Sequence, residues 1–363
     1  MDDTKVPEEI DNDMEALSSD GFSEVKETEK KEKKKWKRWQ KILFGTIIAI
    51  LIVLVGAISA IFILRQRGEN RLKAEEHYTT YNGKRYKFRE DVVNILCLGI
   101  DKNEPIAHIE RKRGNIGMSD AILLVSIDLK EDEVKIFAIP RDSMADIQTT
   151  SSDGQLQDKQ RMQLCYQYAY GVSMEQSNEL TVDAVSHLLY DTPIQRCCAI
   201  NFEALPVLND AIGGVDVVIE EDLEEFVPEF IYGEEIHLEG KLALSFVRSR
   251  NTKRVDGVVL RTQRQKQYAL AFAEKAKDVI SENPTLPITL FQELQKDKNM
   301  CTDITVEDIT YLMPELFKIS FSDDIIQVLP GESVLGESGF AEYKLDVDSV
   351  KKMIIDTFYE EVE

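Results

Sequence analysis

Residues 92–142 open with VVNILCLGID (92–101) and close with SDAILLVSIDLKEDEVKIFAIPRD (119–142), and this stretch decides the fold. Three apolar runs of strand length, rich in Ile, Val and Leu, lie within it at residues 94–100, 121–127 and 134–139. The connection LKED between the second and third runs is short enough for a hairpin. We therefore predict that the second and third strands are antiparallel neighbours.

Charged side chains stand at the ends of these predicted strands. Asp120 begins the second strand, and Arg141 and Asp142 follow the third, so a hairpin places them at one edge of the sheet. If the first strand runs parallel to the third, Asp101 reaches the same edge. Ligands of open α/β sheets usually bind at such an edge. A polar residue after a strand is also common in a solvent-exposed turn, but three such corners on one edge favour a site.

Length and charge restrict the classes of function. The chain has 363 residues and a formal net charge of −22. A tail and a membrane segment, described below, leave about 270–300 residues, enough for one large core or two small ones. The negative charge argues against a nucleic-acid-binding protein, which needs a basic face. It does not exclude an anionic ligand, because arginines can be concentrated at one place.

The N-terminal part has the features of a membrane anchor. Residues 1–41 are acidic at first and then basic (KEKKKWKRWQK), and we expect a disordered tail. Residues 42–64 carry no charge and, as a helix, are long enough to cross a hydrocarbon core of roughly 30 Å. Trp36 and Trp39 stand at the border of this segment as interfacial anchors. A cleaved signal peptide is the alternative, but the apolar run is too long and continues past its only cluster of small residues.

The charges around this segment predict its orientation. Lys and Arg are denser before residue 42 than after residue 64, which places the tail in the cytoplasm and the rest of the chain outside the cell. Residues 65–91 are charged and aromatic, and we expect a juxtamembrane stalk with a little regular structure. Residues 92–363 then form the extracellular domain of a single-pass membrane protein.

The pattern after Asp142 predicts helices that alternate with strands. A helix capped by Thr181 would carry Val182, Val185, Leu188 and Leu189 on one apolar face. Around it we expect a long loop, the start of a helix with an aromatic face, a strand, a helix ended by Gly213-Gly214 and a further strand, at residues 145–160, 162–171, 199–202, 203–212 and 215–219. With the early hairpin, this alternation predicts an α/β fold in which helices sandwich a mixed central sheet.

A second charged cluster lies in FVRSRNTKRVDGVVLRTQRQKQ (246–267). Arg248 and Arg250 share a face if the segment is extended. From about residue 258 we expect a helix through residue 276, on which one stripe at spacing i, i+3 and i+4 contains Arg261, Arg264 and Gln265. The planar guanidinium fork matches two phosphate oxygens at once. A solvent-exposed basic helix face is the alternative, but in so acidic a chain the cluster favours an anionic ligand.

Sequence signatures of other chemistries are missing. The chain has no G-x-S-x-G motif and no Walker A loop. Its four histidines are scattered and do not have the spacing of a zinc site. Of the five cysteines, Cys97 falls within an apolar strand, where we expect it to be a small buried hydrophobic residue.

The order of these motifs resembles the LytR-CpsA-Psr family. The resemblance rests on the anchor, a strand ending in G-x-D, an S-D opening a strand, P-R-D, a helix followed by Gly-Gly-Val-Asp-Val, V-R-S-R, R-x-x-R-Q and a late LPGE. It covers residue 92 to the C-terminus. It implies a phosphotransferase of the cell envelope that moves a glycopolymer, of teichoic acid or capsule type, from an undecaprenyl-pyrophosphate carrier onto peptidoglycan with Mg²⁺. It also implies an α/β sandwich with an apolar tunnel for the polyprenyl chain.

The resemblance also implies roles for individual residues. Asp101 and Asp120 correspond to the magnesium-binding and catalytic carboxylates, and the pyrophosphate ligands would be Arg141, Arg248, Arg250, Arg261, Arg264 and Gln265. The chemistry of these residues agrees, because a pyrophosphate needs hard oxygen ligands around a magnesium ion and arginines that offset developing charge. A carboxylate near the metal would also accept the proton of the attacking sugar hydroxyl.

Two motifs depart from the family pattern. The chain has Met118-Ser119-Asp120 where the family commonly has R-S-D, and DGVVLR (256–261) where it has G-D-F-G-R. We expect Arg113, or failing it Arg111, to replace the missing arginine from the adjacent loop, in which Gly114 and Gly117 give the backbone freedom. The alternative is that this loop only forms a basic rim near an anionic substrate.

We therefore expect a membrane-anchored, magnesium-dependent phosphotransferase. Two other readings stay open: a non-catalytic binder or sensor of polyprenyl-phosphate lipids, and a pyrophosphatase that acts on the carrier. Product analysis distinguishes the three, because a transferase makes a polymer–wall adduct, a hydrolase makes free polymer phosphate, and a binder makes neither.

Overall fold

The computed structural model describes residues 38–102, 117–249, 257–319, 325–337 and 339–362. The chain divides into two units, Met1–Gly56 and Ala57–Glu363. The long helix α1 (Arg38–Leu72) begins in the first unit. Its stretch Ala49–Leu72 contains an 18-residue window that has a mean hydropathy of 2.3 and no buried residue, and the stretch is long and apolar enough to cross a membrane. This overlaps the predicted span 42–64 and is compatible with a single-pass anchor.

A six-stranded mixed sheet forms the centre of the second unit, in the order β11-β8-β3-β4-β5-β12. Its strands are β3 (Val92–Ile100), β4 (Ser119–Asp128), β5 (Glu133–Ala138), β8 (Arg196–Asn201), β11 (Met300–Thr302) and β12 (Ile326–Val328). β4 is antiparallel to both β3 and β5, which confirms the predicted hairpin and makes the first and third strands parallel. β8 is parallel to β3. The carboxyl ends of β3, β5 and β8 therefore lie at one edge, together with the start of β4.

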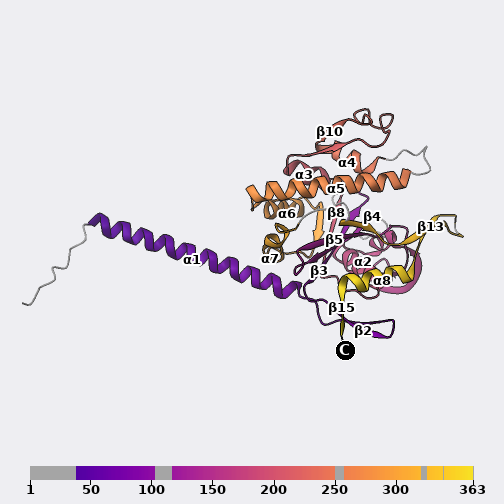
Figure 1. Cartoon of the computed structure of the whole chain (residues 1–363), viewed down its shortest axis with the longest axis horizontal. Helices are drawn as coiled ribbons and strands as arrows, with labels where there is room; N and C mark the ends of the chain where they lie inside the picture. The colour runs from indigo at the N-terminus through magenta and orange to yellow at the C-terminus, as the bar shows by residue number, and fades with distance from the viewer. Residues whose placement is uncertain (1–37, 103–116, 250–256, 320–324, 338, 363) are drawn as a thin grey trace, which may run out of the picture. The chain divides into compact units, whose positions relative to one another are not determined.

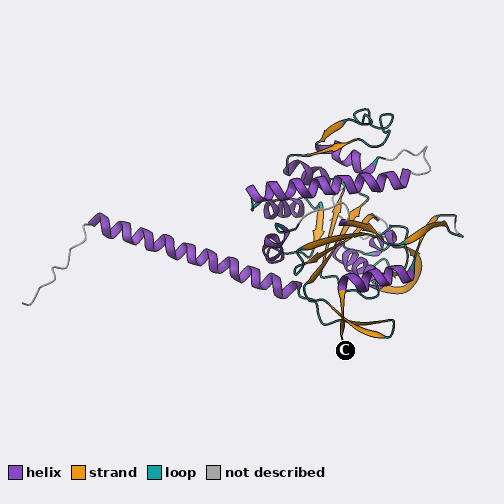
Figure 2. Ribbon diagram, in the orientation of Figure 1, coloured by secondary structure: helices purple, strands orange, loops and turns teal. Residues whose placement is uncertain are grey.

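Helices cover both faces of the sheet (Figures 1 and 2). On one face, α2 (Met174–Leu188) and α8 (Val347–Phe358) pack on alternate residues of the strands. Leu96 and Leu98 of β3, for example, are fully buried there beside Val185 and Phe358. The residues between them on β3 point to the other face and are only half-buried. This asymmetry leaves room on the second face.

The second face is covered by helices that follow β8. They are α3 (Ala204–Ala211), α4 (Gly240–Arg248), α5 (Gly257–Glu282) and α6 (Leu286–Lys296), with the two-stranded sheet β9 (Val215–Val218) and β10 (Glu235–Leu238). α7 (Val306–Leu316) follows β11. The predicted ranges 199–202, 203–212 and 215–219 correspond to β8, α3 and β9. Gly213 and Gly214 end α3 with positive φ angles of 80° and 74°, a conformation that favours glycine.

Three predictions between Asp142 and Leu189 were wrong. The expected loop 145–160 is instead a hairpin of β6 (Met144–Thr150) and β7 (Leu156–Gln163). The expected helix at 162–171 is two short 3₁₀ turns, η1 (Leu164–Tyr166) and η2 (Tyr168–Tyr170). α2 begins at Met174, where the Ser173 side chain accepts a hydrogen bond from the Gln176 amide. Thr181 lies inside the helix, and its hydroxyl donates to the Ser177 carbonyl at 2.7 Å.

The expected stalk 65–91 contains regular structure. It holds the end of α1 and the strands β1 (Tyr78–Tyr81) and β2 (Lys84–Phe88), and β2 pairs with the C-terminal strand β15 (Tyr359–Val362). Phe88 is buried, and its ring meets that of Tyr359 edge-on with centroids 5.6 Å apart. An aromatic residue that packs on the C-terminal strand explains why this charged segment is ordered.

Candidate active site

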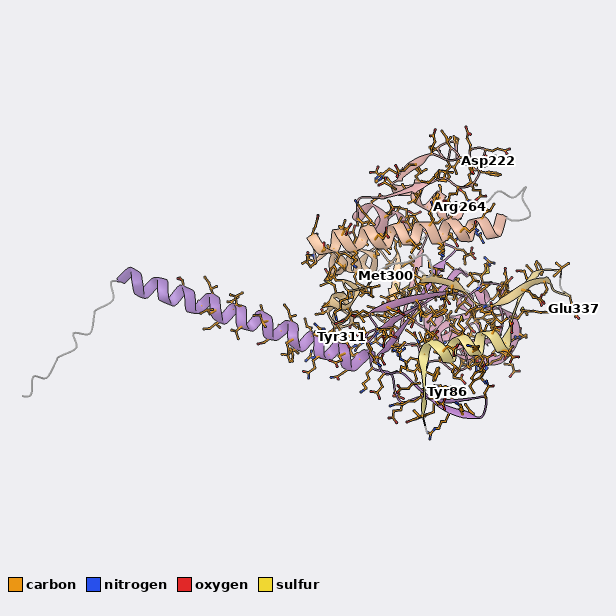
Figure 3. The ribbon with its side chains drawn as sticks, in the orientation of Figure 1. Tyr86, Asp222, Arg264, Met300, Tyr311 and Glu337 are labelled. Atoms are coloured by element: carbon orange, nitrogen blue, oxygen red, sulfur yellow. The ribbon has the colours of Figure 1, made fainter. Side chains whose placement is uncertain are left out.

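A cavity of about 720 Å³ lies between the half-buried face of the sheet and the helices α3 to α6. Its apolar lining comes from the sheet and three helices: Cys97, Leu123, Cys198, Ile200, Leu205, Leu208, Leu244, Val247, Leu294 and Met300. Figure 3 marks Met300, on the edge strand β11. Burial raises the pKa of Cys97 to about 11, so this thiol is uncharged and contributes to the apolar lining. Each of the five cysteines is a free thiol.

Polar side chains reach this cavity at the edge formed by the ends of β3 and β8 and the start of β4. They are Asp101, Asp120, Asn201, Arg248, Arg261 and Gln265. The predicted convergence of Asp101 and Asp120 is therefore found. Asn201 was not predicted, although it is the last residue of β8 and lies opposite Ile100, the residue before Asp101, so the same strand-end rule would have found it. The cavity thus joins an apolar interior to a charged edge.

Asp101 is fixed by the backbone of the segment that leads into β4. Its amide donates to the Met118 carbonyl at 3.0 Å, and the Met118 amide donates to Asp101 Oδ1 at 2.5 Å. Gly117 has a φ of 94°, and a Cβ atom there would lie 3.0 Å from Asp101 Oδ1 and 2.7 Å from Ile100 Cγ2. The glycine permits this close approach. The residue at position 118 therefore holds Asp101 through its backbone, whichever side chain it carries.

Asp120 occupies a β-bulge between β3 and β4. Gly99 lies opposite Ala121 and Ile100 lies opposite Ser119, so Asp120 is the extra residue. Bulges commonly re-aim a side chain next to a functional site. The Asp120 carboxylate forms an ion pair with Arg141, and Arg141 Nε lies 3.5 Å from Asp142 Oδ1. Arg141 therefore reaches the charged edge from the end of β5, as predicted.

The environment of Asp120 shifts its titration. Burial raises the pKa of this carboxyl above its usual value, and the negative charges of Asp101 and Asp142 act in the same direction. The guanidinium groups of Arg141 and Arg261 oppose the shift. The two carboxylates and two arginines are thus close enough to influence one another.

Arg248 and Gln265 come to the cavity from two different helices. Arg248 is the last residue of α4, and its guanidinium lies over the Phe202 ring, 3.8 Å from the centroid. Such a cation–π contact fixes the direction of a long side chain. Gln265 Nε2 donates to the Val247 carbonyl at 3.2 Å, which ties α5 to α4.

Arg264 does not line the cavity, in contrast to the prediction. It lies on α5 (Figure 3) and forms a buried ion pair with Glu221, with both side chains 3% exposed. Its Nε donates to the Phe246 carbonyl at 2.9 Å, and its Nη2 donates to the Ser249 carbonyl. Arg264 therefore holds the C-terminal end of α4, which carries Arg248. The remaining predicted arginines, Arg111, Arg113 and Arg250, lie outside the described residues.

The carboxylates of the charged edge suit a magnesium ion shared with a phosphate ligand. Within the described parts of the chain, no group of three or more His, Cys, Asp or Glu side chains forms a metal cage. Mg²⁺ usually binds through one or two carboxylates, water and substrate phosphates. Asp101 and Asp120 match that donor set, because both line the same cavity.

The family model named LytR_cpsA_psr family matches residues 62–354. The chain belongs to this family. TagT of Bacillus subtilis, named as a polyisoprenyl-teichoic acid–peptidoglycan teichoic acid transferase, is 28% identical over 256 residues, 66% of this chain and 71% of that protein. TagU of Bacillus cereus is 27% identical over 260 residues, which cover 70% and 74% of the two chains. A match to TagU of Halalkalibacterium halodurans spans only about half of that relative, 54%.

Solved structures share the fold of this LytR_cpsA_psr chain. TagV of B. subtilis has a TM-score of 0.55 and 23% identity, with 74% of this chain and 97% of that chain covered. TagT bound to LI-WTA has a TM-score of 0.52 and 24% identity, with 74% and 90% covered. The predicted α/β fold with a mixed central sheet is therefore confirmed, and the glycopolymer transferases among the relatives indicate the general role.

Proposed function

We propose that this chain is a membrane-anchored phosphotransferase that moves an anionic glycopolymer, of teichoic acid or capsule type, from a polyprenyl-pyrophosphate carrier onto peptidoglycan. The observation that carries the proposal is the single cavity that joins an apolar interior to two carboxylates and two arginines. A polyprenyl pyrophosphate has the same two parts, a long apolar chain and a compact anion. The names of the relatives, which specify polyisoprenyl-linked teichoic acid and peptidoglycan, support the same substrates.

Most polar residues of the charged edge have a place in this reaction. Arg141, Arg248, Arg261 and Gln265 would bind the pyrophosphate, and Asp101 and Asp120 would hold Mg²⁺. Arg250, which the sequence adds to the pyrophosphate ligands, lies outside the described residues. The magnesium ion, when bound, offsets negative charge on the phosphate oxygens. The structural role of Arg264 takes it out of this set of ligands.

The proposed transfer balances as a single phosphoryl displacement. A sugar hydroxyl of peptidoglycan attacks the phosphorus next to the glycopolymer, and Asp120 accepts the hydroxyl proton. The new oxygen–phosphorus bond forms while the bond to the bridging oxygen breaks. Polyprenyl phosphate leaves with the electron pair, and Arg141 offsets the charge that develops on it.

The ligand of the cavity is tested by mass spectrometry of the full-length protein in detergent. We expect polyprenyl phosphate or pyrophosphate to co-purify, or to bind after incubation, and uncharged polyprenol to bind at least tenfold more weakly. Arg141→Ala should reduce the difference in affinity between the phosphorylated lipid and polyprenol, because it removes a cation from the charged edge. Equal binding of polyprenol and polyprenyl phosphate would contradict a pyrophosphate site.

A further inference from the structure

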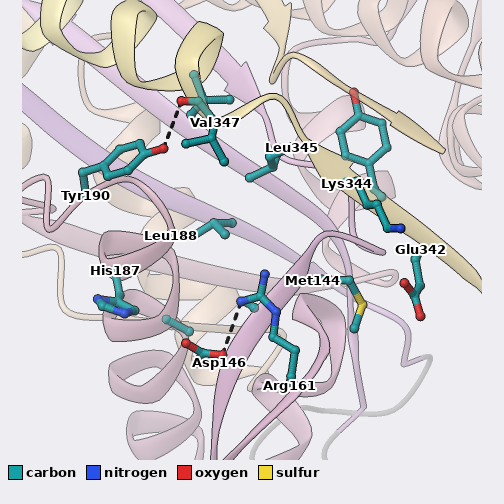
Figure 4. A pocket seen from close by; sticks show the side chains of 14 residues that line it. Met144, Asp146, Arg161, His187, Leu188, Tyr190, Glu342, Lys344, Leu345 and Val347 are labelled. Atoms are coloured by element: carbon teal, nitrogen blue, oxygen red, sulfur yellow. Dashed lines mark hydrogen bonds and ion pairs between the residues drawn. The ribbon is translucent and has the colours of Figure 1, made fainter. Parts of the chain in front are cut away.

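A second cavity of about 500 Å³ lies among elements on the α2 and α8 side of the sheet, whereas the active-site cavity lies on the α3–α6 side. Figure 4 shows this second cavity from close by. It is formed by the β6–β7 hairpin, the end of α2, the start of α8 and β14 (Ala341–Leu345), which pairs with β13 (Gly331–Leu335). Its volume is in the range of small-ligand sites. Neither the carrier lipid nor the pyrophosphate ligands described above use it.

The second cavity combines charges of both signs with an apolar floor. Arg161 and Asp146 form an ion pair at 3.3 Å whose side chains are 58% and 47% exposed, so both remain accessible to a ligand. Glu342 and Lys344 stand on the β14 side of the cavity, across from this pair (Figure 4). The apolar floor is contributed by Met144, Leu188, Leu345 and Val350.

The wall of this cavity is continuous with the segment that supplies Arg141. Met144 lies three residues after Arg141, a distance of at most about 11 Å along an extended chain. The Tyr343 amide donates to the Asp142 carbonyl at 2.8 Å, and Ser143 forms a β-bridge with Tyr343. A ligand held here therefore lies next to the backbone that positions Arg141.

The lining selects for a ligand that carries carboxylates and ammonium groups together with small apolar groups. A polyanion would meet Asp146 and Glu342, and a neutral glycan would offer no charge that could compete for the exposed pair of Arg161 and Asp146. A short peptide could place its carboxylates near the cations, its amine near the anions, and its methyl side chains on the apolar floor. In the proposed reaction, the acceptor contains such a peptide, because peptidoglycan strands carry stem peptides.

We propose that the second cavity binds the stem peptide of the peptidoglycan acceptor and so places the acceptor sugar beside Arg141. This inference rests on the proposed function for the identity of the ligand. It assigns to the chain a substrate site separate from the carrier cavity. Because the ionic partners are exposed, binding should weaken as the salt concentration rises.

The test measures binding of the tetrapeptide L-Ala-γ-D-Glu-L-Lys-D-Ala to the full-length protein in detergent by isothermal titration. Arg161→Ala and Val347→Trp should each weaken binding about tenfold or more. Arg161→Ala removes a cation, and Val347→Trp places a larger side chain in the lining of the cavity. Both positions are exposed, so neither change should unfold the protein. Lys352→Ala is the matched control, because Lys352 is an exposed cation paired with Asp356 elsewhere on α8. A peptide with its amines acetylated and its carboxylates amidated should bind as weakly as the variants bind the parent peptide.

Two results would overturn the inference: no binding of the tetrapeptide to the parent protein, or equal binding by the parent, Arg161→Ala and Val347→Trp. Turnover of the carrier lipid is measured in the same preparations. Turnover without peptide binding refutes the second site and leaves the proposed function standing. Peptide binding without turnover supports the site while it counts against the transferase.

Discussion

Asp120 is placed by a β-bulge so that its half-buried carboxylate meets Arg141 at the edge of the active-site cavity. Asp120→Asn should lower carrier turnover about hundredfold or more, because it removes a proton acceptor and a metal ligand. Asp101→Asn should have a similar effect. Neither residue belongs to the apolar core, so the melting temperature should stay nearly unchanged. A fall of many degrees in either variant would show that the carboxylate is structural instead.

The raised pKa of Asp120 makes a separate prediction about pH. This shift belongs to the metal-free site, because a bound Mg²⁺ would lower the pKa of a carboxylate that holds it. The prediction therefore concerns the stability of the metal-free protein. A raised pKa favours the neutral form in the folded protein, so this contribution is present at low pH and is lost as pH rises through the shifted pKa. The free energy of unfolding of the metal-free parent, relative to that of Asp120→Asn, should therefore fall as pH rises through this range, and a difference that does not change with pH would contradict the raised pKa.

Among the elements, Arg264 of α5 donates hydrogen bonds to carbonyls at the end of α4 and forms a buried ion pair with Glu221, in the segment between β9 and β10. Arg264→Met leaves Glu221 buried without its cation, and such losses destabilise proteins by roughly 3–5 kcal/mol. We expect a clear fall in melting temperature, and a smaller fall when Glu221→Leu is added. The control Arg161→Met breaks an exposed pair worth about 1 kcal/mol or less. If Arg264→Met melts like this control, Arg264 does not hold the helices together.

The elements also show what the sequence predicts and what it leaves open. β3, β4 and β5 were predictable because each is a short apolar run, and their hairpin brought Asp101, Asp120 and Arg141 to one edge. The strand β7 reads LQDKQRMQ and is almost wholly exposed, so it carries no alternation of apolar and polar residues. Arg264 and Arg261 share one stripe of α5, but Arg261 lines the cavity while Arg264 pairs with Glu221. Glu221 is distant in the sequence, so the helical spacing alone could not predict this difference. Met118 holds Asp101 through its backbone amide, and a pattern of side chains cannot predict a backbone hydrogen bond.

At the scale of the whole molecule, the apolar stretch of α1 and the basic residues before it predict the topology. Protease added to intact, wall-stripped cells should digest the part after Arg65 and spare an epitope on residues 1–41. Permeabilised cells serve as the control in which both parts are digested. Loss of the tail epitope from intact cells, with the C-terminal part protected, would reverse the orientation.

The products of one reaction distinguish transfer of the glycopolymer from hydrolysis of the carrier and from binding alone. The full-length protein is incubated with Mg²⁺, a polyprenyl-pyrophosphate-linked glycopolymer and peptidoglycan, and the wall is then digested and analysed by mass spectrometry. We predict a muropeptide joined to the glycopolymer through a phosphodiester, an equal amount of polyprenyl phosphate, and neither product with Asp120→Asn or without Mg²⁺. Polyprenyl phosphate with only free polymer phosphate would identify a hydrolase, and unchanged substrate would identify a binder. Either of these two results contradicts the proposed transfer.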